Sequence, residues 1–405
     1  MLLSDKDIII VGQQAWDTEI GSNCKNIAYE LSKHNRVLYV NPPLDRITRI
    51  GSRHLPAVQR RLDVIAGKVE ALVPIAENLW NLYPDKLIES INWIGPEWIF
   101  DRCNFRNNRI FASTIRRAME KLGFKADVLF NDNDIFRSFY LKDLLAPKIS
   151  VYYVRDYMIA TDYWRKHGRH WEPKLIEKSD LCVANSVFLT NYCKQFNPNA
   201  VYIGQGCELE LFDHQLDIDV PPDVVDIRKP VVGYVGALSS ARLDRDLLRS
   251  LAGRRPDWSF VLVGPEDDGF LGDELHQLTN VHFLGSKPVE QLPDYINAFD
   301  VCINPQLINE LTIGNYPRKI DEYLAMGKPV VATKNETMEI FADHVFLAER
   351  AEQFCDFLEE AMRTNTIDKC NSRRQFAYSH TWEASVATMS THVNDFWAMR
   401  EKRMR

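Results

Sequence analysis

Lys319 and Glu322 are the residues whose types and spacing point most directly to chemistry. They lie three positions apart within residues 315–333, a segment that predicts a short helix closed by Gly327 and followed by a buried strand. Residues at i and i+3 share a helix face, so the ammonium group and the carboxylate are expected side by side, with Arg318 as a second candidate cation. A cation suits phosphate and a carboxylate suits ribose hydroxyls. The pair therefore predicts a site for a nucleotide sugar.

A second candidate region is the turn at residues 236–242, which follows an apolar run. Gly236 permits a tight backbone there, and N–H groups at the start of the next helix favour a bound anion. Ser239 and Arg242 are the polar candidates in this turn. Ser239 and Ser240 have a competing structural role as helix N-caps.

The elements that must position these residues are short apolar runs that alternate with helical patterns. Such alternation is typical of parallel sheets with helices on both faces, and it occurs in two series. We therefore predict an α/β chain of two Rossmann-like doubly wound domains, at residues 1–210 and 228–380, with an amphipathic helix at 381–405 that packs back on the first domain. Strands are expected at 8–11, 37–40, 128–130, 150–153, 181–184 and 201–203, and then at 230–236, 260–263, 281–283, 301–303 and 330–332.

The composition narrows the class of protein. The 405 residues carry a net charge of -7, 45% of them are hydrophobic, and no apolar run approaches the roughly 18 residues that span a bilayer. The chain enters a strand without a signal-peptide pattern, so we expect a cytoplasmic protein. Its eight cysteines form no Cys-x-x-Cys pair, which favours buried thiols over zinc sites or disulfides.

One segment, residues 46–125, is basic, with 14 Lys+Arg against 8 Asp+Glu. Cations favour acidic lipid and aromatic rings favour the headgroup zone, so peripheral contact with an anionic membrane, at the inner face of the cell membrane, is one hypothesis. The other is a solvated helix face above core aromatics. No nucleic-acid motif is present, and no nucleic-acid partner is expected. The aromatic residues concerned are Trp80, Trp93, Trp98, Phe100 and Phe105.

Five motifs follow one another over about a hundred residues of the second series: Gly233-Tyr-Val-Gly236, Phe260-Val-Leu-Val-Gly264, Val281-His-Phe-Leu-Gly285, Asp300-Val-Cys-Ile-Asn-Pro305 and Lys319-x-x-Glu322-Tyr-Leu-Ala-x-Gly-x-Pro329. Together they resemble the donor-binding half of a GT-B glycosyltransferase related to retaining glycosyltransferase family four. The resemblance implies the GT-B fold, with two domains facing a central cleft, the donor in the second domain and the acceptor in the first.

By this resemblance Glu322 holds the donor ribose, Lys319 meets the diphosphate, and Gly264 belongs to the donor-binding set. The donor is expected to be a nucleoside diphosphate sugar, a UDP-sugar first, without a further cofactor. Two positions depart from the family pattern. Arg242 stands alone where relatives carry an Arg and a Lys, and Gly314 stands where retaining members carry a glutamate, so the anomeric outcome is open.

Two carboxylates of the first domain are candidates for the base that takes the acceptor proton. Asp156 follows residues 151–155, in a segment that resembles a strand end of bacterial exopolysaccharide and teichuronic-type glycosyltransferases. A helix cap is its competing role, and Arg155 is placed to neutralise it. Asp17 lies in the loop 12–21, which resembles the acceptor loop of these enzymes, against the alternative of a purely structural polar loop.

The sequence thus predicts transfer of a sugar to the hydroxyl of a glycan or lipid-linked acceptor, in polysaccharide or cell-surface glycan synthesis. A GT-B sugar-nucleotide epimerase and a non-catalytic Rossmann-type nucleotide-binding protein are the alternatives. Asp132 and Asp134 have a metal-binding spacing that also arises by chance in turns, and the expected transfer is metal-independent.

Overall fold

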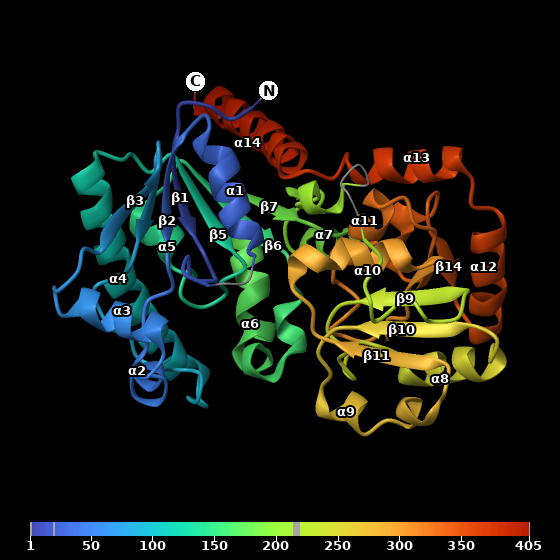
Figure 1. Cartoon of the computed structure of the whole chain (residues 1–405). Coiled ribbons are helices and arrows are strands. Elements are labelled where there is room, and N and C mark those ends of the chain that lie inside the picture. Colours follow the sequence, from blue (N-terminus) through green and yellow to red (C-terminus); the bar gives the residue numbers. More distant parts are fainter. Residues whose placement is uncertain (1, 19–20, 214–218, 405) are drawn as a thin grey trace. The chain divides into compact units, whose positions relative to one another are not determined.

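The computed structural model describes residues 2–18, 21–213 and 219–404 and divides into two compact units. Unit 1 comprises residues 1–206 and 382–405, and unit 2 comprises residues 207–381 (Figure 1). The chain therefore leaves unit 1 once and returns to it once. Each unit has its own sheet and its own hydrophobic cores.

Unit 1 is built on an eight-stranded sheet in the order β3-β4-β2-β1-β5-β6-β7-β8. Its order reverses between β1 and β5, so polar residues that follow these two strands meet at one edge, the topological switch point. The strands are β1 (Asp7–Val11), β2 (Arg36–Val40), β3 (Leu72–Ala76), β4 (Leu79–Leu82), β5 (Val128–Asp132), β6 (Ile149–Val154), β7 (Leu181–Ala184) and β8 (Ala200–Tyr202).

One strand pair of unit 1 departs from the expected parallel pattern. β3 pairs antiparallel with β4, whereas every other pair in the sheet is parallel. Only two residues connect β3 to β4, and Asn78 in this turn has a φ of 62°. Such a connection is too short for a crossover and permits only a hairpin.

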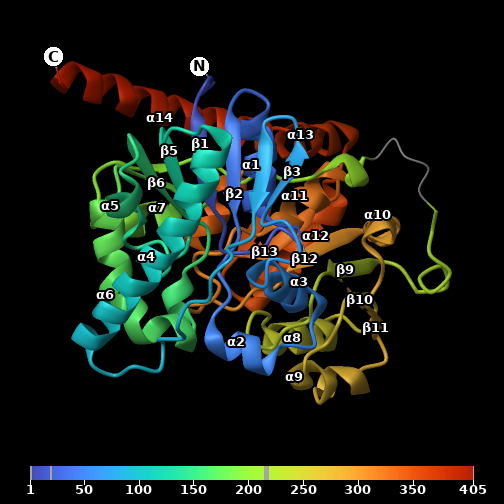
Figure 2. The same ribbon diagram turned by 90° about the vertical axis from the view of Figure 1, so that its left-hand side faces the viewer.

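Helices cover both faces of the unit 1 sheet because its strand residues alternate between faces. Ile8 and Ile10 face α1 and α14, whereas Ile9 and Val11 belong to a core that α4 and α5 complete. α14 lies beside α1, as Figures 1 and 2 show. The helices are α1 (Asn23–Ser32), α2 (Arg46–Gly51), α3 (Pro56–Ile65), α4 (Glu97–Leu122), α5 (Leu141–Leu145), α6 (Asp162–Lys178), α7 (Val187–Lys194) and α14 (Trp382–Met404).

Unit 2 has a six-stranded, wholly parallel sheet in the order β11-β10-β9-β12-β13-β14, with its switch point between β9 and β12. Helices α10, α11 and α13 cover one face, and α8 and α12 cover the other. The strands are β9 (Val231–Val235), β10 (Ser259–Val263), β11 (Val281–Gly285), β12 (Val301–Asn304), β13 (Val330–Thr333) and β14 (Phe346–Ala348). The helices are α8 (Arg245–Arg254), α9 (Asp268–Leu271), α10 (Leu292–Ala298), α11 (Arg318–Ala325), α12 (Ala351–Arg363) and α13 (Ile367–Ala377).

A buried carboxyl group in unit 1 makes stability depend on pH. Glu172 on α6 is fully buried, and it accepts hydrogen bonds from the hydroxyls of Tyr152 (2.8 Å) and Tyr192 (3.1 Å). Burial raises the pKa of Glu172 from 4.5 to about 7, although the two hydrogen bonds oppose the shift.

We expect Glu172→Gln to remove this pH dependence. The folded wild-type protein binds the proton more tightly than the unfolded chain, so its unfolding free energy falls as pH rises from 4.5 to about 7, by roughly 3 kcal/mol in all. The variant should match the wild type near pH 4.5 and exceed its stability at pH 8 in urea unfolding. Glu177→Gln, an exposed change on the same helix, is the control and should follow the wild type at both pH values.

Candidate functional site

The candidate site of unit 2 lies where β9, β10 and β12 end. Gly236 follows β9 with a φ of 139°, and Gly264 follows β10 with a φ of 150°, conformations that L side chains rarely adopt. The two turns touch, since a Cβ added to Gly264 would lie 2.0 Å from the carbonyl oxygen of Gly236. Glycine at both positions therefore keeps the backbone open at the switch point.

We expect Gly264→Ala to weaken ligand binding at this turn and to cost about 1–3 kcal/mol of stability through backbone strain. Gly253→Ala is the matched control, because nothing lies within 4 Å of a Cβ added there and alanine suits the interior of α8 better than glycine. Urea unfolding should show a loss for the first variant and no loss for the second. Equal stability in both variants would contradict the strain argument.

Lys319 lies in the first turn of α11, directly against the Gly236 turn. Its Nζ donates a hydrogen bond to the hydroxyl of Tyr234 at 2.5 Å, and it lies 3.1 Å from the place of a Cβ on Gly236. Among the described residues no carboxylate oxygen lies within 4.0 Å of this Nζ to form an ion pair. The ammonium group is therefore positioned by a neutral phenol and keeps its charge for an anion at the turn.

Glu322 lies one helical turn further along α11 and is half-buried. Burial raises the pKa of its carboxyl group, although Arg318 and Lys319 oppose the shift. In the part of the chain that the structure describes, its carboxylate accepts no hydrogen bond. A half-buried carboxylate without donors suits a ligand that supplies them, such as a pair of hydroxyl groups.

The remaining cations predicted for this site are exposed. Arg318 and Arg242 both extend into solvent, and neither has an ion-pair partner among the described residues. Lys319 and not Arg318 is the half-buried member of the adjacent pair, as expected when neighbours on a helix point about a hundred degrees apart. Arg242 stays in the turn that follows β9.

The two serines of the turn do not cap α8. The N-cap is Asp244, whose side chain accepts from the amide of Leu247 at 2.9 Å, so the N-cap interpretation of Ser239 and Ser240 is wrong. The amide and hydroxyl of Ser240 instead donate to Asp267 at 2.7 and 3.0 Å. Asp267 thereby holds the turn in place.

Two residues that the sequence analysis did not single out belong to this region, together with Asn304. Tyr234 positions Lys319, and Asp267 holds the serine turn. Asn304, at the end of β12, is 2% exposed, and its Nδ2 has no hydrogen-bond partner within the described ranges. Its type and its place at a strand end predict Asn304 as a candidate contact to the donor sugar or its phosphate, with turn geometry as its competing role.

In unit 1, Arg155 follows β6 and binds polar residues at the ends of neighbouring strands, together with the candidate base Asp156. Its Nε donates to the fully buried Asp132 at 2.8 Å, one Nη to Asp156 at 2.6 Å and the other to Gln13 at 2.9 Å. Asn133 accepts from the amides of Arg155 and Asp156. Asp156 is thus ion-paired and keeps a partly exposed side chain.

Asp17 does not belong to this cluster. Its carboxylate pairs instead with Arg61 at 2.9 Å. Residues 19 and 20 of its loop lie outside the described residues. The structure does not bring Asp17 into contact with Asp156. Each candidate base is held by an arginine.

The aspartates with metal-binding spacing are also paired with arginines, Asp132 with Arg155 and Asp134 with Arg137 at 2.5 Å. No group of three or more metal-ligating side chains occurs in the described part of the chain. Within the same residues, no helix combines the length and the apolar character needed to cross a bilayer.

Comparison with known proteins gives matches to both the sequence and the fold. Residues 229–364 match the family model described as glycosyl transferases group 1. The chain is 26% identical over 240 residues to TuaH of Bacillus subtilis (strain 168), whose name describes a teichuronic acid biosynthesis glycosyltransferase. This match covers 55% of the chain and 59% of TuaH, so the chain spans less than two thirds of that relative.

Solved structures resemble the whole chain. Sucrose-phosphate synthase from Thermosynechococcus elongatus superposes with a TM-score of 0.64 at 15% identity, covering 97% of this chain and 100% of that one. Anabaena Alr3699/HepE, solved in complex with UDP, gives 0.62 at 15% identity, covering 96% and 99%. The predictions of fold and family resemblance are confirmed: the chain has the GT-B fold, and its unit 2 carries a domain of the glycosyl transferases group 1 family.

Proposed function

We propose that this chain transfers a sugar from a nucleoside diphosphate sugar to a hydroxyl group of a glycan or lipid-linked acceptor. The observation that carries the proposal is the pairing on α11 of Lys319, whose ammonium group lies over the Gly236 turn, with Glu322, whose carboxylate has no donor in the described residues. The first suits a diphosphate and the second suits two ribose hydroxyls. The family match over residues 229–364 supports this assignment.

The donor that we favour is a UDP-sugar, in line with the HepE structure that contains UDP. In such a transfer the bond from the sugar to the diphosphate breaks, and negative charge grows on the departing phosphate. Lys319, Arg242, Arg318 and the N–H groups of the Gly236 turn would stabilise that charge. No metal ion takes part in this proposal.

The base that takes the acceptor proton is proposed to be Asp156, with Asp17 as its rival. Asp156 follows β6, the strand next to β5, and has the more exposed carboxylate, 40% against 18% of the side chain. Asp156→Asn should lower kcat by about 100-fold, the range of general base catalysis, while UDP affinity is retained. The same loss in Asp17→Asn alone would transfer the role to Asp17.

The test of the function is a titration of the protein with UDP, GDP and TDP, followed by an assay of UDP release. Tight binding of UDP that Lys319→Met abolishes is the expected result. UDP release from a UDP-sugar should require an acceptor, since transfer consumes both. Release without any acceptor, or the absence of nucleotide binding, would overturn the proposal.

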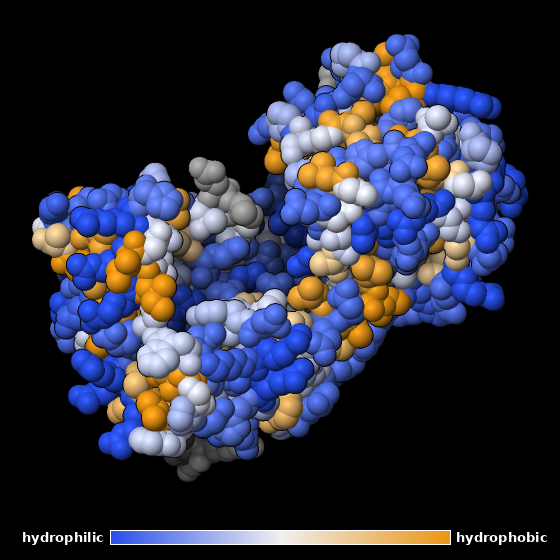
Figure 3. Space-filling model, turned by 90° about the horizontal axis from the view of Figure 1, so that it is seen from below, coloured by the Kyte–Doolittle hydropathy of each residue, from blue (hydrophilic) through white to orange (hydrophobic). Residues whose placement is uncertain are grey.

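We further propose that unit 1 contacts an anionic membrane through α2 and the residues after it. Ile50 and Leu55 are exposed, and they stand among the exposed cations Arg49 and Arg53. Figure 3, a view from below, shows apolar side chains gathered in patches on the surface of unit 1. Apolar residues among cations favour the headgroup zone of acidic lipid, whereas Phe100 of the same basic segment is a core residue.

Anionic vesicles should bind the protein at low salt and release it at high salt. Ile50→Ser should weaken this binding roughly tenfold, because one buried isoleucine contributes about 1.5–3 kcal/mol. Ile367→Ser is the matched control, since Ile367 is equally exposed on α13 of unit 2. Sedimentation that is equal with anionic and neutral vesicles, or absent with both, would contradict the membrane proposal.

A further inference from the structure

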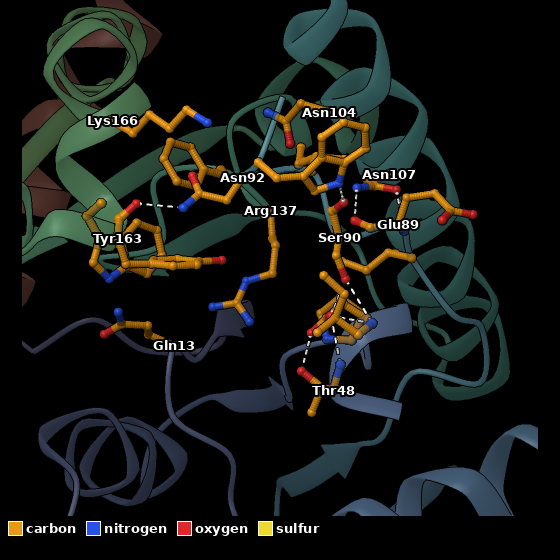
Figure 4. Close-up of a pocket in the computed structure, with 18 of the residues that line it drawn as sticks. Gln13, Thr48, Glu89, Ser90, Asn92, Asn104, Asn107, Arg137, Tyr163 and Lys166 are labelled. Carbon is orange, nitrogen blue, oxygen red and sulfur yellow. Dashed lines mark hydrogen bonds between the residues drawn. The ribbon is translucent and has the colours of Figure 1, made fainter. Parts of the chain in front are cut away.

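Unit 1 contains a cavity of about 890 Å³ that none of the predicted site residues lines. It lies between α2, the segment before α4, and the start of α6 (Figure 4). A volume of several hundred Å³ is typical of small-molecule sites, and here it accommodates a ligand of disaccharide size.

The carboxylates of this cavity are already satisfied. Asp45 accepts from the amides of Ile47 and Thr48, from the Thr48 hydroxyl and from Ser90. Glu89 forms two hydrogen bonds with Arg46, at 2.7 and 2.9 Å. Neither carboxylate therefore attracts a further cation strongly.

The cations, by contrast, retain free donors. Lys166, exposed near the start of α6, has no hydrogen-bond or ion-pair partner among the described residues. Arg137 pairs with Asp134 through Nε, and its two Nη groups bond to no described residue. Figure 4 shows Arg137 extending into the middle of the cavity. The unused charge of the cavity is thus positive, which favours an anionic ligand.

Two amide side chains each have one unpaired polar atom. Asn104 on α4 is 1% exposed, and its Nδ2 donates to no described residue. Asn92 donates from Nδ2 to the carbonyl of Tyr163 at 2.8 Å, but its buried Oδ1 accepts nothing. A buried donor and a buried acceptor left unpaired cost free energy, which a hydroxyl-rich ligand would recover.

The rim is aromatic. Trp93 is 73% exposed, yet its indole is fixed by a hydrogen bond of 2.8 Å from Nε1 to the carbonyl of Ser90. Tyr163 is also exposed, and it packs edge to face on Trp164, which stacks on Phe136. Rigid, exposed rings beside amides suit the apolar C–H face of a sugar ring.

From these contacts we infer that the cavity binds an acidic saccharide, a sugar unit that carries a carboxylate or a phosphate. Lys166 and the Nη groups of Arg137 hold the anionic group, Asn92 and Asn104 meet hydroxyls, and Trp93 covers a ring face. This inference rests on the proposed function only in naming that saccharide as part of the acceptor. Binding itself requires no donor and is measured separately.

The test is calorimetric titration of the full chain, without nucleotide, with three probes: a glucuronate-containing disaccharide, glucose 1-phosphate and neutral cellobiose. We expect an acidic probe to bind at least tenfold more tightly than cellobiose, and the stronger of the two acidic probes identifies carboxylate or phosphate as the anionic group. Lys166→Gln should weaken this preference, because only Arg137 then remains to hold the anionic group, whereas Lys174→Gln, an exposed lysine outside the cavity on the same helix, should leave it intact.

A second variant separates stacking from charge. Trp93→Ala should weaken the acidic probes and cellobiose by the same factor, because it removes a ring contact and leaves the cations. Equal affinity for acidic and neutral probes, no binding of any probe at 10 mM (roughly 100 times a typical KM), or a preference undiminished by Lys166→Gln would each overturn the inference. Loss of UDP binding alone, with the acidic preference retained, would instead refute the proposed function.

Discussion

Glu322→Gln is expected to lower kcat/KM for the nucleotide sugar by about 100-fold. A carboxylate that accepts from two hydroxyls makes charge-assisted hydrogen bonds, and losing about 3 kcal/mol of them corresponds to two powers of ten. The ribose is bound equally before and during transfer, so the loss should appear mainly in KM. Steady-state kinetics and UDP titration measure it. Glu360→Gln, an exposed change on α12, is the control and should have no effect.

The same substitution should stabilise the empty protein. Because the pKa of Glu322 is raised in the folded state, ionising this group favours the unfolded chain at every pH above the ordinary pKa of glutamate. Glu322→Gln should therefore melt at a higher temperature than the wild type at pH 8, and the difference should shrink as pH falls towards 4. A variant that binds UDP normally, or that is less stable at pH 8, would contradict the ligand role.

Lys319→Met should affect different kinetic constants from Glu322→Gln. Charge on the departing phosphate is largest in the transition state, so this variant should lose kcat as well as affinity. Tyr234→Phe removes the hydroxyl that holds the ammonium group and should produce a smaller loss of the same kind. Comparing the two variants separates the effect of the Lys319 charge from the effect of the hydroxyl that holds it in position.

Arg155→Met is expected to cost about 3–5 kcal/mol of stability. Arg155 is the ion-pair partner of Asp132, which is fully buried, and removing one member of a buried pair leaves an uncompensated charge. Urea unfolding measures the loss. Asp156→Asn removes only the partly exposed partner and should cost much less.

A double variant tests the cause. Asp132→Asn in the Arg155→Met background removes the unpaired negative charge of Asp132, so it should restore part of the lost stability. If the two substitutions acted independently, their losses of unfolding free energy would instead add. An Arg155→Met protein as stable as the wild type would show that the buried pair does not contribute to the fold. The double variant would then be no more stable than the single one.

The sequence predicted eleven of the fourteen strands that the structure describes, all except β3, β4 and β14, and the helix α11 with its closing glycine, because these depend on local patterns. Lys319, Glu322 and Gly327 occur within nine residues, and glycine after a helix end has a local geometric meaning, seen here as a φ of 72°. Apolar runs marked the strands for the same reason. The boundaries differ by one or two residues, as at β9, which is Val231–Val235.

What the sequence could not predict depends on contacts between distant residues. Asp267 reaches Ser240 across 27 positions, and Tyr234 reaches Lys319 across 85. No local sequence pattern links Asp267 to Ser240 or Tyr234 to Lys319. The cavity of unit 1 is a stronger case, because Asn104 and Lys166 come from helices whose packing no local periodicity specifies.

Because the chain crosses from unit 1 to unit 2 and back, the two units are completed at different times during synthesis. Every residue of unit 2 is synthesised before the final 24 residues of unit 1 are made. Until then the surface that receives Trp382, Val386, Met389 and Val393 is bare, although these side chains belong to a core with Ile8 and Ile10. The core of unit 1 is therefore completed after all of unit 2 has been synthesised, and its apolar face stays uncovered until α14 is made.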